Sequence, residues 1–501
     1  MLRSLKTYLL PSKVHATART PAQSRRHHDR SQQDLPHPFR LEELKGLDLY
    51  EISVVEIQQG LTEGRFTSVD YVELCLRRIH SVNPYLECII EVNPDAVKIA
   101  VDLDDERRQV GEGFKLLLLS LQGKARGQDA NYRRFMGFTR KQNGSSSGSA
   151  VAVSANIVPL SFGTETDTSI IGPASINGVV GIKPTVGLTS RAGVIPISKS
   201  MDTVGSFGRT VIDAVHGLNA IVGIDERDTM TCSSSRLQRE DYSKYLTTKA
   251  SLKGARFGLP NKRCWEFVTK DIREEALKVL EAIEEAGANI FEVDFPCAEN
   301  RIPADGNWDW THGKPSESEF TVVKVDAYNG INAYLSELSE TSVRRLDDVI
   351  KYNDENSGTE GANPGDHAAY PTGQDNFRGV LQGKGWEDET YCKALDYMQH
   401  KCRTEGIDAA LKETGTDEGL DALLLFDRKG AGQQIAAQAG TQFQLRVPSE
   451  TRFSFLVFRK FSKRLCSVST PVGFYALASQ LFSLSLAFTR GESIVYQDLE
   501  L

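Results

Sequence analysis

The chain has 501 residues, of which 40% are hydrophobic and 25% are charged, and its formal net charge is −8. This length and composition are typical of a globular protein with one large domain or two to three smaller ones. The acidic balance argues against nucleic acid as an obligate partner. The eight scattered cysteines include no CxxC pair and the histidines show no metal-ligand spacing, which argues against a disulfide framework or a metal site.

Residues 1–40 differ from the rest of the chain. They are basic and rich in Ser and Thr, with no acidic residue before Asp29. This composition is similar to that of a mitochondrial transit segment, but Pro11, Pro21 and Pro36 interrupt any helix. We therefore expect a disordered basic tail on a cytoplasmic protein, with a mitochondrial location as the alternative. Residues 472–488 are apolar but too short to predict a membrane span.

From residue 41 the pattern predicts ordered structure in which helices alternate with short strands. Helices are expected at 53–63, at 68–81 with Ser68 as the N-cap, and at 271–286 with Asp271 as the cap and Gly287 at the end. Short buried strands are expected at 158–162 and 178–182, a further strand at 289–293, and a long polar loop at 353–375. This alternation predicts an α/β fold with a mixed β-sheet core flanked by helices.

Two turns rich in Gly, Ser and Thr lie 24 positions apart and carry the chemistry that the sequence suggests. Ser145 stands in GSSSGSA at 144–150, and Ser169 stands in GTETDTSI at 163–170. Such turns let backbone N–H groups point at an anion or a forming oxyanion, and they present a hydroxyl for nucleophilic attack. Taken alone, each cluster is more typical of an ordinary polar loop, because short turns are common, and only the pair together favours a site.

The two turns and the residues after them closely resemble the amidase signature family. The match continues through GVVGIKPT at 178–185, SRAGVIP at 190–196 and DTVGSFGRTVIDA at 202–214. The resemblance implies an α/β domain that hydrolyses small-molecule carboxamides through a serine acyl-enzyme, without a metal or other cofactor. It implies no obligate membrane partner, and it leaves the oligomeric state open.

The resemblance also implies a role for each matching site residue. Ser169 corresponds to the acyl-forming nucleophile. Ser145 corresponds to a bridging serine, which in this family lies on a non-proline cis peptide. The backbone N–H groups of Thr166, Asp167 and Thr168 correspond to the oxyanion hole. The family's general base is a buried, unprotonated lysine, because burial lowers the pKa of a lysine.

Three departures from the family pattern bear on activity. The segment that carries the base lysine is not found, and Lys115 and Lys124 are the nearby candidates without the expected context. Thr168 stands where the family usually has Gly, so a β-branched residue is expected to be strained there. After residue 440 the resemblance fades. We therefore divide the chain into a tail at 1–40, an amidase-signature domain at 41–440 and a divergent segment at 441–501.

These observations predict an amide hydrolase with Ser169 and Ser145 as catalytic residues. One alternative is a catalytically impaired member of the same fold that lacks the base lysine and binds amides without turning them over. Another is a truncated or mis-spliced gene model of an active enzyme. Trp308 and Trp310 are candidate pocket-lining residues, although isolated aromatic residues more often serve in packing.

Overall fold

The computed structural model describes most of the chain between residues 42 and 459. The described ranges are 42–110, 144–232, 241–246, 248–339, 341–366, 372–412, 419–426, 431–440, 443–448 and 454–459. Lys115 and Lys124 lie outside these ranges, as do the tail at 1–40 and residues 472–488.

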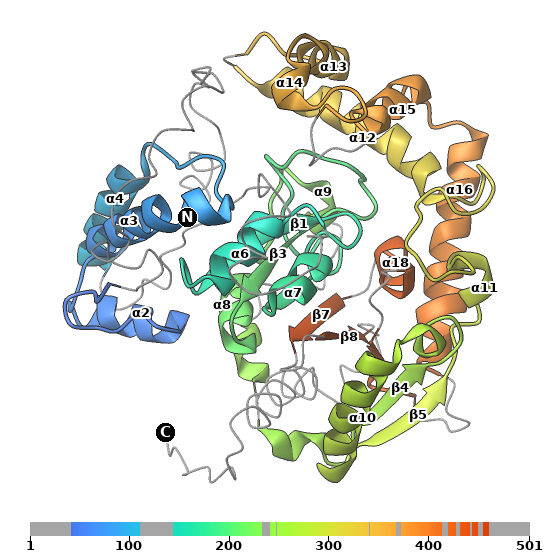
Figure 1. Ribbon diagram of the computed structural model, residues 1–501, viewed down its shortest axis with the longest axis horizontal. Coiled ribbons are helices and arrows are strands. Elements are labelled where there is room, and N and C mark those ends of the chain that lie inside the picture. Colours follow the sequence, from blue (N-terminus) through green and yellow to red (C-terminus); the bar gives the residue numbers. More distant parts are fainter. Residues whose placement is uncertain are drawn as a thin grey trace, which may run out of the picture.

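A mixed sheet of eight strands forms the centre of the molecule, in the order β1-β3-β2-β7-β8-β6-β4-β5 (Figure 1). Strand β4 is parallel to β5 and β6, and the remaining pairs are antiparallel. This confirms the predicted α/β class with a mixed sheet. The strands are β1 Leu160–Glu165, β2 Val180–Lys183, β3 Thr203–Gly208, β4 Arg256–Pro260, β5 Asn289–Val293, β6 Ala422–Leu425, β7 Phe443–Pro448 and β8 Ser454–Arg459.

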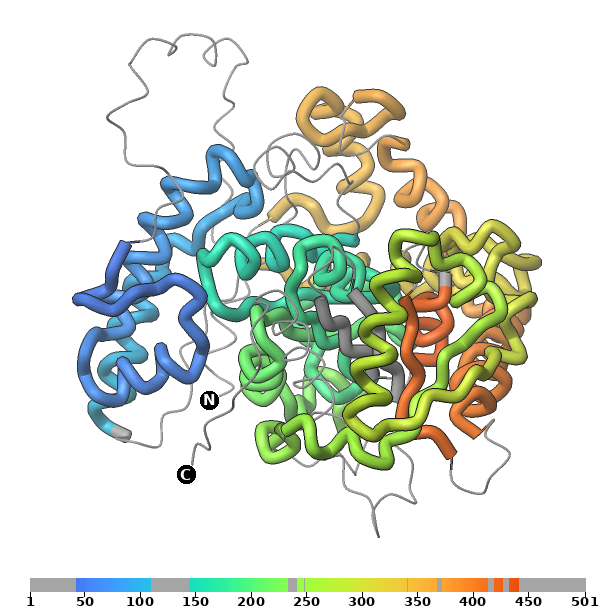
Figure 2. The backbone as a smooth tube through the Cα atoms, turned by 60° about the horizontal axis from the view of Figure 1, so that its bottom comes forward, coloured from blue at the N-terminus to red at the C-terminus, as the bar shows by residue number. Residues whose placement is uncertain are grey.

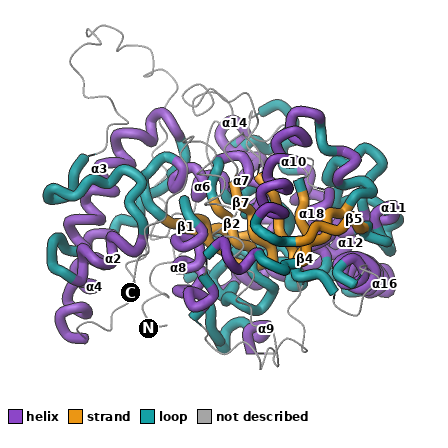
Figure 3. The backbone as a smooth tube through the Cα atoms, turned by 90° about the horizontal axis from the view of Figure 1, so that it is seen from below, coloured by secondary structure: helices purple, strands orange, loops and turns teal. Residues whose placement is uncertain are grey.

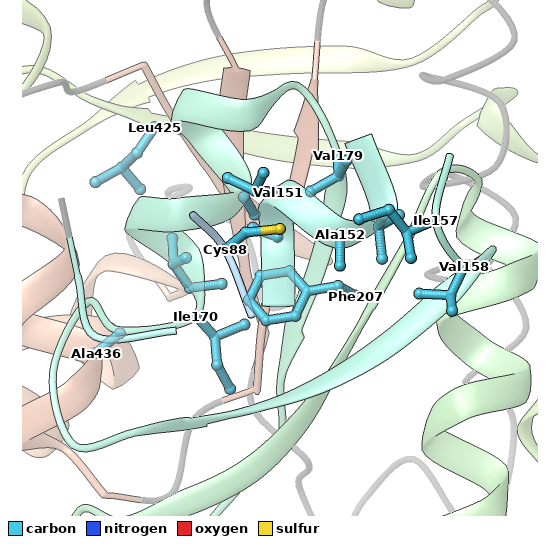
Figure 4. Packing of buried hydrophobic residues seen from close by; sticks show 14 of the residues in the cluster. Cys88, Val151, Ala152, Ile157, Val158, Ile170, Val179, Phe207, Leu425 and Ala436 are labelled. Atoms are coloured by element: carbon cyan, nitrogen blue, oxygen red, sulfur yellow. The ribbon is translucent and has the colours of Figure 1, made fainter. Parts of the chain in front are cut away.

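Helices cover both faces of this sheet (Figure 3). One apolar cluster joins α6 (Ser147–Ser154), α7 (Ile171–Asn177) and α18 (Ala431–Gln438) to one face. A second cluster joins α8 (Val211–Ile221) and α10 (Lys270–Glu285) to the other. Figure 4 shows the first cluster, where Val151, Ala152 and Ile170 pack around Phe207. The two serine turns therefore lie at the ends of elements that an apolar core holds in place.

Two further groups of helices flank the sheet (Figure 2), and both contribute residues to the first apolar cluster. The N-terminal group is α2 Val54–Thr62, α3 Ser68–Leu86 and α4 Ala96–Val110. The second group is α11 Ala298–Arg301, α12 Glu319–Glu337, α13 Leu346–Glu355, α14 Ser357–Glu360, α15 Asp375–Gly383, α16 Glu389–Gln399, a π-helical segment His400–Ile407 and α17 Asp408–Ala410. Short elements α9 (Thr229–Cys232), Tyr242–Tyr245, Lys249–Leu252 and Trp265–Phe267 complete the set.

Several predicted helix boundaries need correction. Thr67, rather than Ser68, caps α3, because its hydroxyl accepts the Asp70 N–H (3.1 Å) while the Asp70 carboxylate accepts the Thr67 N–H. Helix α10 likewise begins one residue before the predicted cap Asp271, after Thr269. Part of the predicted polar loop is helical, since α13 continues to Glu355 and α14 follows it. Across the described ranges, none of the helices has the length and apolar character that crossing a membrane requires.

Candidate active site

The two serine turns meet at the start of helices α6 and α7. Ser145 is exposed and Ser169 is half-buried. The backbone N–H of Ser145 donates to Ser169 Oγ at 3.3 Å, and the N–H of Ser146 donates to the Ser169 carbonyl at 3.2 Å. The two predicted catalytic residues, 24 positions apart in the sequence, are thus in direct contact in the fold.

The first turn holds its shape through local hydrogen bonds and one glycine. Gly144 has φ +89°, and a Cβ there would lie 2.6 Å from Pro173 Cδ, so this position favours Gly. Ser147 Oγ donates to the Gly144 carbonyl at 2.6 Å. No cis peptide bond occurs within the described ranges, which corrects the expectation of one at Ser145. The left-handed Gly144 forms the turn with trans bonds, which are the lower-energy form.

The residue before the candidate nucleophile has a strained backbone. Thr168 has φ +61°, a left-handed conformation that is rare for a β-branched side chain. This confirms the expectation drawn from the replacement of Gly by Thr. The Thr168 carbonyl accepts the N–H of Gly172 at 2.8 Å. Gly172 lies in helix α7, after Ser169, so this hydrogen bond fixes the strained residue to the helix that follows the candidate nucleophile.

Glu165 anchors the other end of the second turn. Its Oε2 accepts the N–H groups of Ile170 (2.5 Å) and Ile171 (2.9 Å), the two residues after Ser169. Burial raises the pKa of this carboxyl group, and the buried Lys183 acts in the opposite direction. Burial in turn lowers the pKa of Lys183, against the charges of Glu165, Asp167 and Asp202. The turn around Ser169 is therefore tied to a buried cation in strand β2.

The side chains of Thr166 and Asp167 are also held by distant residues. Thr166 Oγ1 donates to Asp202 Oδ1 at 2.6 Å, and Asp202 Oδ2 accepts the N–H groups of Ile197 and Ser198. Asp167 Oδ2 accepts a hydrogen bond from Trp308 Nε1. These contacts fix the segment whose backbone N–H groups were predicted to face an oxyanion.

A small cavity of about 50 Å³ opens beside Ser145. Its wall includes polar atoms of Thr166 and Asp202, the guanidinium-bearing Arg191, and apolar side chains that include Ile195. Arg191 is fixed by two hydrogen bonds of 2.8 Å to the two carboxylate oxygens of Asp228. The cavity therefore offers a largely apolar wall with one oriented cation.

The two candidate tryptophans are packed together near this site. The Trp308 and Trp310 rings are 5.4 Å apart, and Trp310 is 5.1 Å from Phe320. Trp308 remains 36% exposed, so it joins the aromatic group to Asp167 and also faces solvent.

The sequence did not point to Asp202, Glu319 or Lys183, although the lysine within an apolar strand segment was a signal of a buried charge.

Comparison with known proteins shows which chains this protein is similar to. The family model described as Amidase matches residues 138–353. A Schizosaccharomyces pombe protein described as an amidase is 37% identical over 468 residues, covering 80% of each chain. An Arabidopsis thaliana protein described as an amidase is 32% identical, covering 74% of this chain and 79% of that one.

Solved structures show the same relationship. The native peptide amidase from Stenotrophomonas maltophilia superposes with a TM-score of 0.68 at 26% identity, covering 87% of this chain and 97% of that chain. An amidase family protein from Bacillus anthracis shares the fold, with a TM-score of 0.67 at 22% identity and coverage of 87% and 92%. Fold, sequence relatives and the family model agree, and the chain belongs to the amidase signature family.

Proposed function

We propose that this protein hydrolyses carboxamides through an acyl-enzyme formed on Ser169. The observation that carries the proposal is the contact between the two serine turns, in which the Ser145 N–H donates to Ser169 Oγ at 3.3 Å. A hydroxyl held in a Gly/Ser/Thr-rich turn at the start of a helix is placed for attack and close to backbone donors. Membership of the amidase family supplies the reaction class.

The proposed reaction has two steps. Ser169 Oγ attacks the amide carbon and passes its proton by way of the Ser145 hydroxyl to the leaving nitrogen, and the amide oxygen becomes an oxyanion stabilised by the N–H groups of Thr166, Asp167 and Thr168. The C–N bond then breaks, the nitrogen departs with that proton as ammonia or an amine, and an ester remains on Ser169. Water attacks that ester, releasing the carboxylic acid and restoring the serine.

The cavity beside Ser145 suggests the class of substrate. Its apolar wall around Ile195 favours amides with an apolar acyl group, and Arg191 can donate hydrogen bonds to a carbonyl or carboxylate oxygen of the same molecule. Because the solved relative from Stenotrophomonas maltophilia is a peptide amidase, we propose that peptide amides belong in the substrate panel with simple aliphatic and aromatic amides.

A catalytically impaired amidase is the second candidate, and two observations favour it. The family segment that carries the base lysine is not recognisable in the sequence, and Thr168 takes the strained φ of +61° beside the nucleophile. The buried Lys183 faces the carboxylates of Glu165, Asp167 and Asp202, so we assign it to charge compensation rather than to proton abstraction from Ser145.

Labelling with an active-serine probe, followed by turnover of the amide panel, separates the two candidates. The proposal predicts that the wild type is labelled and turns over at least one amide, and that Ser169→Ala loses both, with turnover falling by about 10⁴-fold or more. Ser154→Ala is the matched control, because Ser154 Oγ donates to the Asn177 carbonyl at 2.8 Å, away from the two turns. Turnover that survives Ser169→Ala would overturn the site. A folded wild type that is neither labelled nor active would establish the impaired alternative.

A further inference from the structure

Two buried carboxyl groups meet behind the candidate nucleophile and have no part in the proposed chemistry. Asp167 lies in the turn before Ser169, and Glu319 is the first residue of helix α12. The two carboxyl groups interact, since Glu319 contributes with burial to raising the pKa of Asp167. Asp167 is 8% exposed and Glu319 is 1% exposed. They join the nucleophile turn to a helix about 150 residues away in the sequence.

Each carboxyl group has one oxygen with hydrogen-bond donors and one without. Trp308 Nε1 donates to Asp167 Oδ2, while Gln434 (2.8 Å) and Gln438 (2.7 Å) donate to Glu319 Oε2. Within the described ranges, Asp167 Oδ1 and Glu319 Oε1 are buried without a hydrogen-bond partner. An ionised carboxylate only accepts hydrogen bonds, so two of them in contact repel each other, whereas a single proton between them forms a strong hydrogen bond.

The charges around the pair also favour a proton on it. Glu165 and Lys183 face Asp167 from strands β1 and β2, and burial raises the Asp167 pKa. Arg301 of α11 faces Glu319 and donates to Gln438 Oε1, the amide that bonds Glu319.

The thiol of Cys402, from the segment His400–Ile407, also donates to Gln438 Oε1 (3.0 Å), and burial raises its pKa to about 11. The thiol is therefore neutral near pH 7. Glu165, Asp167 and Glu319 thus face two cations, and Asp202 also faces Lys183. The carboxyl groups outnumber the cations, so a proton on the pair reduces an excess of buried negative charge.

We propose that Asp167 and Glu319 share a single proton, and that this proton holds the turn before Ser169 in place. Glu319 is then a positioning residue for the amide hydrolysis proposed above, on which this role rests. Loss of the proton leaves two adjacent anions in a buried site, and the turn that carries the oxyanion donors is pushed away from helix α12. The rate of amide hydrolysis is therefore expected to decline at alkaline pH, as this pair loses its shared proton.

The substitution Glu319→Gln tests the shared proton directly. A glutamine amide N–H can replace the proton toward Asp167 Oδ1, while its carbonyl oxygen can still accept from Gln434 and Gln438. Glu337→Gln, an exposed position on the same helix, is the matched control. Glu319→Ala removes the partner altogether, and a displacement of the turn by about 1 Å is expected to lower kcat about a hundredfold.

The pH profile of kcat gives the first readout. Glu319→Gln is expected to keep the neutral-pH rate and to lose the alkaline decline, while Glu337→Gln retains the wild-type profile. An alkaline decline that is unchanged in Glu319→Gln would overturn the proposal. If no amide is turned over, the rate at which the active-serine probe labels Ser169 replaces kcat in the same comparison.

Infrared difference spectroscopy gives a readout that does not depend on activity. The carbonyl stretch of one protonated carboxyl group is expected in the wild type at neutral pH and should be absent from both Glu319→Gln and Asp167→Asn, but present in Glu337→Gln. The wild type could show this band, and the two variants lose it, without any amidase activity. That result would support the shared proton and would count only against the proposed function. Persistence of the band in both variants would overturn the shared proton whatever the activity.

Discussion

Lys183, buried at the end of strand β2, is the cation that most strongly opposes the effect of burial on the Glu165 carboxyl group. Glu165 ends strand β1 and accepts the N–H groups of Ile170 and Ile171, immediately after Ser169. The Lys183 charge in β2 thus stabilises the Glu165 carboxylate in β1, and that carboxylate binds the N–H groups at the start of helix α7. Lys183 Nζ itself has no hydrogen-bond partner within the described ranges, so the coupling is electrostatic.

Lys183→Met is expected to destabilise the protein by about 3–5 kcal/mol at neutral pH, because it leaves the buried Glu165 charge without a cation. The loss should shrink as the pH falls, since Glu165 can then take up a proton. Chemical denaturation at several pH values measures it. The double variant Lys183→Met/Glu165→Gln should recover part of the loss, and additive effects of the two substitutions would contradict the pairing.

Thr168→Gly is expected to raise the free energy of unfolding by about 1 kcal/mol. Glycine adopts φ +61° without steric cost, and relief of the strained β-branched residue outweighs the greater freedom of glycine in the unfolded chain. Thermal and chemical unfolding provide the measurement. Thr164→Gly, inside strand β1, is the contrasting control and should destabilise. A loss of stability in Thr168→Gly would show that the Thr168 side chain contributes more than its backbone strain costs.

Gly205→Ala is expected to destabilise by about 1–3 kcal/mol or more. A Cβ at this position in strand β3 would lie 2.0 Å from the Ile182 carbonyl oxygen, and a backbone atom of a neighbouring strand cannot move aside cheaply. Gly358→Ala in α14 is the control, because nothing lies within 4 Å of a Cβ there. Equal stability of the two variants in denaturant unfolding would contradict the predicted close approach of β2 and β3.

Asp202 predicts a specific pH dependence of stability. Burial raises its pKa to about 6, against the hydrogen bonds from Thr166, Ile197 and Ser198, whereas an unfolded Asp titrates near 4. Because the folded pKa is the higher one, this group's stabilising contribution is full below about pH 4 and is lost as the pH rises through about 6.

The comparison of wild type with Asp202→Asn isolates this effect, because the other titrating groups are common to both. Relative to the variant, the wild type should lose about 3 kcal/mol of unfolding free energy between about pH 4 and pH 7. Urea denaturation across this range gives the difference curve. A difference that stays constant with pH would show that the Asp202 pKa is not raised in the folded protein.

Local patterns allowed much of the fold, and the two turns of the candidate site, to be predicted. The strand at 289–293 matches β5, and the Gly/Ser/Thr-rich segments correctly indicated two turns that come together at Ser145 and Ser169. These features depend on neighbouring residues and on motif spacing. Cap positions were less accurate, since Thr67 and Ser68 are both good caps and only the contact of Thr67 with Asp70 decides between them.

The remaining parts of the site depend on contacts between distant segments. The hydrogen bond from Trp308 to Asp167 spans 141 residues, and the one from Gln438 to Glu319 spans 119. No local periodicity encodes such partners, because they are set by how the helices pack over the sheet. The fully buried Lys183 was missed for the same reason: its compensating carboxylates come from other parts of the chain.

The sheet order has a consequence for how the chain folds. Strands β7 and β8 stand between β2 and β6, so they join the half that contains β1, β3 and β2 to the half that contains β6, β4 and β5. During synthesis on the ribosome, the two halves of the sheet can form early. They cannot be joined by β7 and β8 until the chain has been synthesised to residue 459. Pairings of such long sequence separation form slowly, and until then the edges of β2 and β6 are open to other chains. Nascent chains stalled before β7 are therefore the species that we expect to need a chaperone.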